Sequence, residues 1–484
     1  MTRPAAVPFL PIALDHAGGG LQEQIVSALR AAIAAGTLPA GARLPSIRDL
    51  TAALQVSRTT VSLALEKLVD EELLVARLRS GIFVGARMEP TPVPRRPGPR
   101  ELAASVHLSE RGRTLAAGGF PFGLRRPQAF RLSRPALELF PVRQWNKLLA
   151  HRASRITLSQ LDYEPESPAL KAAVAVLVSA TRGFRVEPAQ VLLFSGSQRA
   201  LEFAATCLLN PGDAAWMEDP GYPGATQTLR AAGARVVPRA VDGEGLTLRG
   251  RRGPAPRLIY VTPSSQFPLG GAMSLARRFE LLAFAGATGA CLVEDDYEVE
   301  FSAAGAQLPA LAALDRAGRV LYVGSFSRTT VPALRLGYLI APPGLAEKLS
   351  AARNALEDPL PSIVQLTLAD FISGGHFAQH VRRMRKVYAE RRRALVEAVE
   401  RSRHLRLRAP PDGLHAVALL PAGCDDAAVS EAARARGLEA LPLSRFCAAV
   451  QLGPALVLGY GTVRPEDAGP AVRKLDAAAA ACLR

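Results

Sequence analysis

Lysine is scarce in this chain of 484 residues, because only six of its 59 basic side chains are lysine and the rest are arginine. Five scattered cysteines show neither metal-ligand spacing nor a disulfide pattern, so we expect reduced thiols and a cytoplasmic protein. Seven histidines include no HExxH motif, and no metal site is expected. No apolar run approaches about twenty residues, and the N-terminus lacks a signal-peptide pattern. These absences argue against a disulfide-rich secreted protein and against a membrane protein.

The composition favours a large basic protein of two or more domains. Hydrophobic residues make up 49% of the chain, which is enough for a sizeable core. The formal net charge is +16 and the isoelectric point is near 10.3. Such a charge favours a polyanionic partner such as DNA. A GC-rich genome that encodes many arginines explains the charge equally well, so charge alone does not decide.

The first part of the chain has the pattern of a winged helix-turn-helix. Apolar residues at helical spacing predict helices over 21–35, 47–54 and 58 to about 71. Two alternating runs, 73–77 and 82–84, predict a β-hairpin. Two helices joined by a short turn and followed by a hairpin describe a winged helix-turn-helix, whose second helix enters the major groove of DNA. The alternative is a helical hairpin used for protein contact.

The N-terminal end of the third predicted helix carries DNA-contact chemistry. Ser46 and Ser57 are placed as N-caps of the second and third helices. An arginine and short polar side chains at the start of the third helix suit phosphates and base edges. The candidate DNA-binding residues are Arg43, Ser46, Arg48, Ser57, Arg58, Thr59, Thr60, Arg77 and Arg79.

Three motifs in this region resemble the GntR-type DNA-binding module. They are LPSIRDL from Leu44, VSRTTV from Val56 and SGIFV from Ser80, within about residues 18–86. The resemblance implies that Arg48 and Arg58 contact DNA, with Thr59 and Thr60 in support and Arg77 beside the wing. Arg79 stands where the family has glycine at the wing tip and adds a cation near the minor groove. The sequence therefore predicts a DNA-binding domain over residues 1–88.

Residues 89–134 form a Pro/Arg-rich linker. It is either a basic tether that touches phosphates or a solvated spacer. In the second domain, residues 135–484, strand-like runs alternate with helical ones, which favours a mostly parallel α/β sheet with sites at the strand C-terminal ends. The expected strands cover 191–194, 214–217, 235–237, 257–261, 290–294 and 320–323.

Polar residues follow several of these strands. The small residues after 191–194 leave backbone N–H groups accessible at a helix N-terminus, which suits phosphate. Hydroxyls and a fixed cation after 320–323 suit an anionic group. A carboxylate at the end of the strand 290–294 can pair with a protonated pyridine nitrogen. The candidate cofactor-binding residues are Gly196, Ser197, Gln198, Tyr222, Asp295, Tyr297, Ser325, Ser327, Arg328 and Arg335.

The segment SFSRTTVPALRLGY from Ser325 resembles the cofactor-lysine segment of fold-type-I pyridoxal-phosphate (PLP) proteins, in the form seen in MocR/GabR-like transcription regulators. Further matches are EDPGYP from Glu218, TPSSQFPLG from Thr262 and EDDY from Glu294. The resemblance implies a fold-type-I aminotransferase-like domain, with a large subdomain over about 165–340 and a small α+β subdomain over about 341–484.

The resemblance also implies roles for the candidate residues. Tyr222 is expected to stack on the pyridine ring, Asp295 to pair with its nitrogen, and Tyr297 to lie near its O3′. Asp296 is then a neighbour in an ion pair. Members of the family form head-to-tail homodimers. Residues 162–165 (DYEP) resemble the loop that lends a tyrosine across the dimer, although the glycine that follows in the family is absent.

The family's lysine is missing, because Arg328 occupies its position. A Schiff base needs a neutral amine, whereas a guanidinium stays protonated and is a poor nucleophile. Ser265 and Leu269 replace a histidine and a threonine of the family pattern. The strand near Leu456 lacks the arginine that holds a substrate carboxylate in transaminases, and Arg445 is the nearest candidate. These losses gather around one pocket.

Three functions remain open at this point. The preferred hypothesis is a regulator that binds operator DNA as a homodimer and senses a small anionic effector, such as PLP, pyridoxamine phosphate (PMP) or an amino-acid-like molecule. The effector would bind noncovalently, and no enzymatic activity is expected. The first alternative is a ligand-independent DNA-binding dimer without cofactor. The second is an active aminotransferase, which needs a catalytic lysine.

Overall fold

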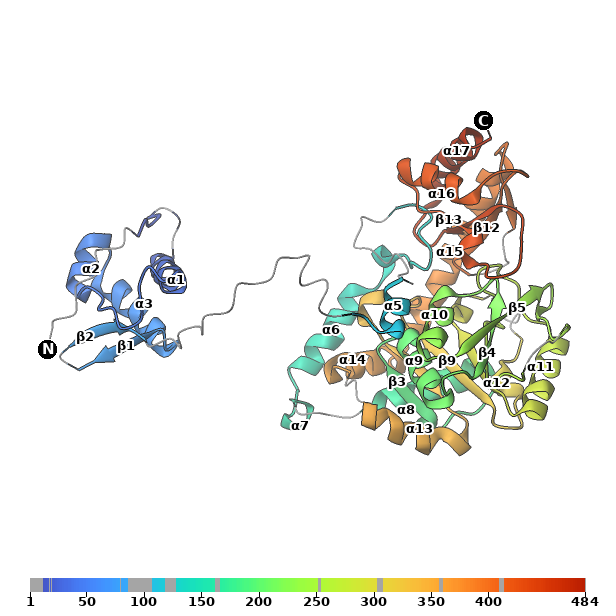
Figure 1. The fold of residues 1–484 in the computed structure, drawn as a ribbon, viewed down its shortest axis with the longest axis horizontal. Coiled ribbons are helices and arrows are strands. Elements are labelled where there is room, and N and C mark those ends of the chain that lie inside the picture. The colour runs from blue at the N-terminus through green and yellow to red at the C-terminus, as the bar shows by residue number, and fades with distance from the viewer. Residues whose placement is uncertain are drawn as a thin grey trace. The chain divides into compact units, whose positions relative to one another are not determined.

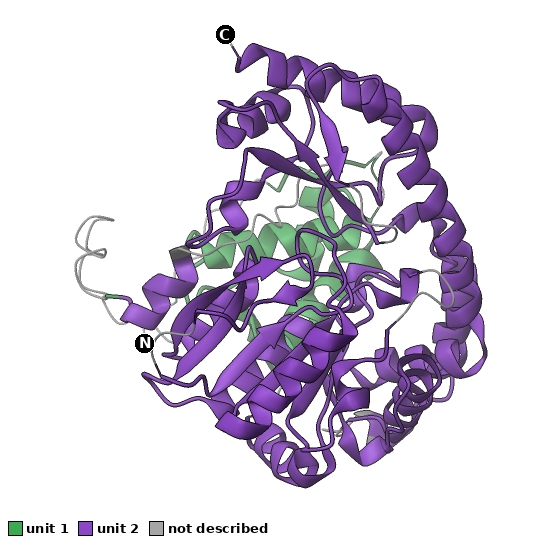
Figure 2. Cartoon of the chain, turned by 90° about the vertical axis from the view of Figure 1, so that its right-hand side faces the viewer, with its two compact units in different colours: residues 1–107 green, residues 108–484 purple. Residues whose placement is uncertain are grey.

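The computed structural model describes residues 12–16, 18, 20–78, 80–85, 107–117, 128–161, 166–250, 254–302, 308–356, 360–408 and 413–483. The chain divides into two compact units, Met1–His107 and Leu108–Arg484 (Figure 2). Arg79, the loop 162–165 and much of the predicted linker lie outside the described residues. Within the described part of the chain, no helix is long and apolar enough to cross a membrane.

The first unit is a winged helix-turn-helix, as predicted (Figure 1). Its apolar core joins all three helices and the hairpin. In the hairpin, antiparallel pairing runs from Leu74 opposite Val84 to Arg77 opposite Gly81. The elements are α1 (Leu21–Ala34), α2 (Ile47–Leu54), α3 (Arg58–Asp70), β1 (Leu74–Arg77) and β2 (Gly81–Val84).

Two ion pairs tie α1 to the third helix and its end. Arg30 pairs with Glu71 at 2.8 Å, and Lys67 of α3 pairs with Glu23 at 2.9 Å. Both pairs are solvent-exposed, so water and salt screen their charges and neither contributes much to stability. The buried core therefore supplies most of the stability of this unit.

The second unit contains a large sheet and a small one, each covered by helices (Figure 1). Its α-helices are α5 (Glu110–Ala117), α6 (Val142–Ala153), α7 (Leu158–Leu161), α8 (Pro168–Arg182), α9 (Ser197–Leu208), α10 (Pro223–Ala231), α11 (Leu275–Thr288), α12 (Leu311–Leu314), α13 (Pro343–Leu356), α14 (Ser362–Ser373), α15 (His376–Glu400), α16 (Asp426–Ala435) and α17 (Pro465–Ala481). Its strands are β3 (Val191–Phe194), β4 (Ala214–Asp219), β5 (Arg235–Asp242), β6 (Gly245–Leu246), β7 (Leu258–Val261), β8 (Cys291–Asp296), β9 (Val320–Ser325), β10 (Gly337–Ile340), β11 (Arg406–Arg408), β12 (His415–Leu419), β13 (Leu441–Pro442) and β14 (Ala455–Gly459).

The large sheet has eight strands in the order β3-β10-β9-β8-β7-β4-β5-β6. From β9 to β5 neighbouring strands are parallel, as the alternation of strands and helices predicted. Strand β10 runs antiparallel between β3 and β9, so that Gly337 lies opposite both Phe194 and Ser325. The start of β10 therefore meets the C-terminal ends of β3 and β9 at one edge of the sheet.

Side chains alternate between the two faces of this sheet, as they must in strands. Met217, Tyr260 and Val293 pack in the core formed with α9, α10 and α13. Their neighbours Trp216 and Ile259 pack on the opposite face with residues of α11. Burial on both faces explains why these strands were recognisable as continuous apolar runs.

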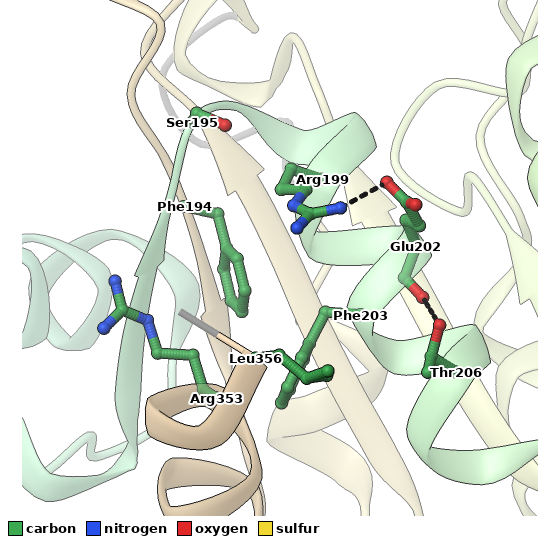
Figure 3. Close-up of a pocket in the computed structure, with 8 residues that line it drawn as sticks. All are labelled: Phe194, Ser195, Arg199, Glu202, Phe203, Thr206, Arg353 and Leu356. Atoms are coloured by element: carbon green, nitrogen blue, oxygen red, sulfur yellow. Dashed lines mark hydrogen bonds and ion pairs between the residues drawn. The ribbon is translucent and has the colours of Figure 1, made fainter. Parts of the chain in front are cut away.

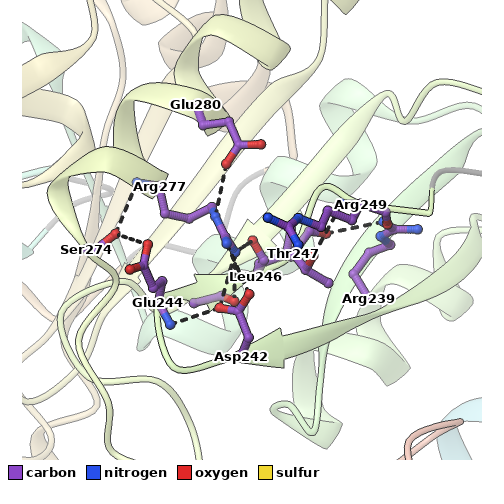
Figure 4. Close-up of polar contacts among 10 residues, drawn as sticks. Arg239, Asp242, Glu244, Leu246, Thr247, Arg249, Ser274, Arg277 and Glu280 are labelled. Atoms are coloured by element: carbon purple, nitrogen blue, oxygen red, sulfur yellow. Dashed lines mark hydrogen bonds and ion pairs between the residues drawn. The ribbon is translucent and has the colours of Figure 1, made fainter.

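A polar network holds the β5–β6 edge of the sheet to α11 (Figure 4). Arg277 pairs with Asp242 and with Glu280, each at 3.0 Å. Ser274 caps α11 and donates to Glu244 at 2.9 Å. This network is remote in sequence from the candidate residues and serves the fold.

The small sheet is antiparallel, in the order β11-β12-β14-β13, and packs with α15, α16 and α17. Helix α15 is rich in arginine, but not all of its arginines face solvent. Arg391 is buried, donates to the Gly461 carbonyl and pairs with Glu138 at 2.7 Å. Its partners come from distant segments, which periodicity along the helix cannot reveal.

Candidate functional site

The first candidate site is the face of the winged helix around the start of α3. Ser57 is the N-cap of α3 and accepts from the Thr60 amide at 3.0 Å, and its hydroxyl is 2.7 Å from that of Thr60. Ser46 caps α2 in a reciprocal arrangement with Asp49. Both predicted caps are confirmed. The hydroxyls of Ser46, Ser57 and Thr60 are thus engaged in holding the helix starts.

The arginines of this face are exposed. Arg43, Arg48, Arg58 and Arg77 all lie at the surface, and Thr59 is exposed beside Arg58. Among the described residues, none of the four arginines forms an ion pair with a carboxylate, whereas Arg30 of the same unit does. Cations without intramolecular counter-ions at a helix start are suited to phosphate oxygens.

The wing is braced against the body of the unit. Residues 41–44 run beside β2, with the Leu44 amide donating to the Ile82 carbonyl at 2.9 Å. The guanidinium of Arg77 lies 4.8 Å from the ring centroid of Phe83. A Cβ on Gly81, whose φ is +111°, would come within 3.1 Å of Arg43 Nε. Arg43 and Arg77 therefore both lie against β2, toward the tip of the wing.

The second candidate site lies at the C-terminal edge of the large sheet. Asp295 is the penultimate residue of β8 and is 8% exposed. Its Oδ2 accepts from the Tyr260 hydroxyl at 2.6 Å, while its Oδ1 is buried without a hydrogen-bond partner. Burial raises the pKa of Asp295 to about 6, against the opposing effects of Tyr260 and Arg328. A buried carboxylate oxygen without a partner is costly, and a cationic or N–H donor would satisfy it.

Tyr222 belongs to the same site. Burial, together with Asp295, raises the pKa of Tyr222 to about 12, while Arg328 acts in the opposite direction, so the three groups are neighbours. The ring packs edge-on against Phe267, with centroids 5.7 Å apart. A Cβ on Gly224 would lie 2.5 Å from Tyr222 Cζ, so glycine at 224 leaves room for the ring.

The strand ends beside Asp295 form an open, N–H-rich edge. No side chain caps the start of α9, whose N-cap is Gly196, and Ser197 opens that helix. The close approach of β10 requires Gly337, where a Cβ would lie 2.7 Å from the Gly196 carbonyl carbon. Ser325 ends β9 and accepts from the Ser327 amide at 3.2 Å. Uncapped helical N–H groups and hydroxyls at one edge suit an oxyanion.

Two further candidates flank this edge. Arg335 precedes β10, is exposed and has φ +47°, a left-handed backbone conformation that few non-glycine residues adopt. Gln198 follows Ser197 in α9 and accepts from the Tyr222 hydroxyl at 3.2 Å. The structure therefore links the start of α9 directly to Tyr222.

Arg328 is paired within the site. Its guanidinium donates to Glu298, whose side chain is 1% exposed, and lies 4.5 Å from the ring centroid of Tyr297. Burial lowers the pKa of Arg328, but Glu298 and Tyr297 outweigh it and the pKa is raised. Burial raises the pKa of Glu298, but Arg328, His415 and the Leu414 amide together outweigh burial, and the pKa is lowered. Both groups are therefore held as ions.

Glu298 also reaches the small subdomain. Its Oε2 accepts from the Leu414 amide at 2.9 Å and lies 3.6 Å from His415 Nδ1. His415 begins β12 and is buried. The pair of Arg328 and Glu298 thus joins the segment after β9 to the small sheet. The predicted neighbour Asp296 does form an ion pair, with Arg182 at 2.5 Å.

A cavity of about 160 Å³ lies between the end of β3, α9 and α13 (Figure 3). Its walls include Phe194, Phe203, Arg199 and Arg353. Arg199 pairs with Glu202 at 2.9 Å and Arg353 with Glu166 at 3.5 Å. Ser195 is the point where this cavity adjoins the candidate edge, and none of the predicted cofactor residues lines it.

No arginine stands in the strand where transaminases carry the one that holds a substrate carboxylate. Strand β14 is entirely apolar and buried. Arg445 lies in the short helix Leu443–Phe446 and is exposed.

Two residues of this site were missed at first. Tyr260 lies in β7 opposite Val293 of β8, and its hydroxyl donates to Asp295, two residues further along β8. Glu298 stands in the acidic run that begins at Glu294. A buried arginine in place of lysine calls for a nearby carboxylate, and that requirement was the signal available in the sequence.

Comparisons with known proteins agree with this organisation. Residues 21–84 match the bacterial regulatory proteins of the gntR family, and residues 141–447 match aminotransferase class I and II. The chain is similar to the probable rhizopine catabolism regulatory protein MocR of Rhizobium meliloti, with 37% identity over 95% of this chain and 93% of that protein. It is 35% identical to the transcriptional regulator TauR of Rhodobacter capsulatus, over 82% of this chain and 83% of TauR.

A solved structure shares the fold of the second unit. The α-aminoadipate aminotransferase LysN of Thermus thermophilus, complexed with N-(5'-phosphopyridoxyl)-L-leucine, is 30% identical to this chain. The match has a TM-score of 0.67 and covers 78% of this chain and 95% of that one.

Proposed function

The chain belongs to the MocR-like transcription regulators, which join a GntR-family DNA-binding domain to an aminotransferase-like domain, and we propose that its second unit senses a small anionic ligand without covalent attachment. The protein is a DNA-binding transcription regulator. Its aminotransferase-like fold is one that binds PLP or PMP. The noncovalent mode, the effector and the dimer are parts of the proposal.

The observation that carries the proposal is the unsatisfied Oδ1 of Asp295. An oxygen buried without a partner favours a ligand that donates to it, and a protonated pyridine nitrogen is such a donor. Tyr222 offers a ring face beside it, and the start of α9 with Ser325 offers N–H and hydroxyl groups for a phosphate. These residues fit PLP or PMP, whose pyridine ring acts as an electron sink when bound.

Position 328 argues against enzymatic turnover. The Arg328 guanidinium stays protonated beside Glu298, so at neutral pH it can neither attack a carbonyl group nor accept a proton from a substrate. We expect Arg328 to hold Tyr297 and Glu298 in place rather than to react.

We further propose that the regulator acts as a homodimer on operator DNA, with Arg58 at the major groove.

Calorimetric titration tests the ligand proposal. We expect saturable binding of PMP or PLP to the wild-type protein and at least about tenfold weaker binding to Asp295→Ala, since that variant loses the ring-nitrogen partner. The matched control is Asp242→Ala, which removes an acidic side chain at the far edge of the sheet. Absence of heat with PLP, PMP and amino acids would favour the ligand-independent DNA-binding dimer.

A further inference from the structure

Helix α5, the first described helix of the second unit, has low intrinsic stability. Helix α5 has eight residues, ERGRTLAA, and includes Gly112. Isolated helices of this length are unstable in water, and glycine lowers their stability further. The described side chains of α5 are exposed or half-buried, so little core burial supports the helix. The stability of α5 therefore depends on what it docks against.

Helix α5 lies beside α10 (Figure 1), and one side chain of α10 donates hydrogen bonds to the C-terminal carbonyls of α5. The Gln227 Nε2 donates to the carbonyl oxygens of Thr114 at 3.2 Å and of Leu115 at 2.7 Å. The last four carbonyls of a helix have no partner within the helix. Gln227 thus satisfies two of those four for α5.

The helix that carries Gln227 begins at the ligand site. Tyr222 is the N-cap residue of α10, and its hydroxyl donates to Gln198 at 3.2 Å. Gln198 in turn donates to the Gly224 carbonyl at 3.0 Å and to the Thr228 hydroxyl. Gln227 therefore lies little more than one helical turn from the Tyr222 end of the same helix.

Helix α5 follows the DNA-binding unit directly in the chain, so its contact with α10 affects the connection between the units. The DNA-binding unit ends at His107, and α5 begins at Glu110. Eight residues span about 12 Å as a helix and up to about 27 Å when extended. Whether α5 is docked therefore changes the reach of the tether by about 15 Å, and reach sets the effective concentration of linked binding modules.

We propose that α5 is a regulatory latch, docked on α10 through Gln227, which transmits occupancy of the Tyr222 site to the tether of the DNA-binding unit. This proposal rests on the proposed ligand sensing. A ring stacked on Tyr222 fixes the start of α10 and favours the docked, short tether. By reciprocity, releasing α5 weakens ligand binding by the same factor by which the ligand strengthens docking.

Hydrogen–deuterium exchange of the full-length protein tests the latch, read from peptides that cover residues 110–117. We expect Gln227→Ala to raise their exchange rate at least about fivefold, because it removes the two bonds to α5. The matched control is Arg230→Ala, an exposed residue of the same helix, which should leave the rate unchanged. Unchanged exchange in peptides of β9 shows that the fold is retained. Equal rates in Gln227→Ala and in the wild type would overturn the latch.

Two further arms separate the latch from the ligand proposal. Saturating PMP should slow exchange at 110–117 at least about threefold in the wild type but not in Gln227→Ala, and no slowing despite calorimetric binding would refute the coupling. Tyr222→Phe, which loses the bond to Gln198, should raise the exchange rate without any ligand. If PLP and PMP do not bind, the ligand proposal fails while the Tyr222→Phe result still decides the coupling, since an unchanged rate contradicts it.

Discussion

The two units use the same side chain in opposite ways. Arg58, at the start of α3, is exposed and forms no ion pair among the described residues. Arg328, in the second unit, is largely buried, paired with Glu298 and packed on the face of Tyr297. The first guanidinium keeps its charge available for an external phosphate, whereas the second uses its charge within the fold. In this molecule, the surroundings of an arginine decide whether it binds a partner or supports a site.

The comparison is tested most strongly at Arg328. Arg328→Ala leaves the carboxylate of Glu298 buried without its main counter-ion, and removal of one partner of a buried pair typically costs about 3–5 kcal/mol. We expect a loss of that size in urea unfolding. Arg464→Ala, which removes an exposed ion pair with Asp467, should leave the stability almost unchanged. Equal small losses of stability for Arg328→Ala and Arg464→Ala would contradict the buried environment of Arg328.

Asp295 is a second buried charge of the second unit, and the pH dependence of stability tests its environment. Its pKa is about 6 in the fold against about 3.9 when unfolded, mainly because of burial, with Tyr260 and Arg328 opposing and Asp296 reinforcing the shift. Since the folded state binds this proton more tightly, ionisation destabilises the fold as pH rises from about 4 to about 6. Asp295→Asn should therefore be more stable than the wild type by up to about 3 kcal/mol at pH 8, with the gain vanishing toward pH 4.

Thermal and urea unfolding at several pH values measure this difference. Asp213→Asn, at the turn before β4, is the matched control for the substitution itself. A gain that is the same at pH 4 and pH 8 would contradict the raised pKa of Asp295.

Arg58 tests the other half of the comparison. Arg58→Ala should weaken binding to operator DNA about 100-fold, because it removes a guanidinium proposed to contact DNA at the start of α3. Thermal stability should not change, because the side chain is exposed. Fluorescence anisotropy on a duplex selected by the wild-type protein from random sequence measures the effect. Arg30→Ala, on α1, is the control, and undiminished binding by Arg58→Ala would misplace the recognition helix.

The smallest effect is expected at the cap of the recognition helix. Ser57→Ala removes the acceptor for the Thr60 amide and should destabilise the first unit by about 1 kcal/mol. Ser57→Gly should cost only a few tenths of that amount, since glycine is tolerated at N-caps. Thermal unfolding of both variants measures the two losses of stability. Equal losses for Ser57→Ala and Ser57→Gly would argue against a capping role of Ser57.

Much of the fold was readable from the sequence because its signals are local. The apolar run of β3 and the caps Ser46 and Ser57 were placed correctly from spacing alone. Strand β10 could not be placed, because its antiparallel insertion between β3 and β9 depends on pairing between distant segments.

The candidate site divides in the same way. Asp295 was identifiable as a carboxylate at a strand end, but its lone unsatisfied oxygen depends on Tyr260 of the neighbouring strand. Glu298 was missed as the partner of Arg328, since its support by Leu414 comes from a segment more than a hundred residues away. A sequence names the chemistry of such a site, while the three-dimensional pairing decides which charges remain available.

The central claim is that the second unit keeps a pyridine-cofactor site but has given up covalent attachment. The most direct measurement is to saturate the full-length protein with PLP, reduce with borohydride and determine the intact mass. Our account predicts saturable PLP binding by calorimetry and an unmodified mass, because Arg328 offers no nucleophilic amine. A protein that gains the mass of one reduced pyridoxal phosphate, on a lysine that lies in the site, would contradict it.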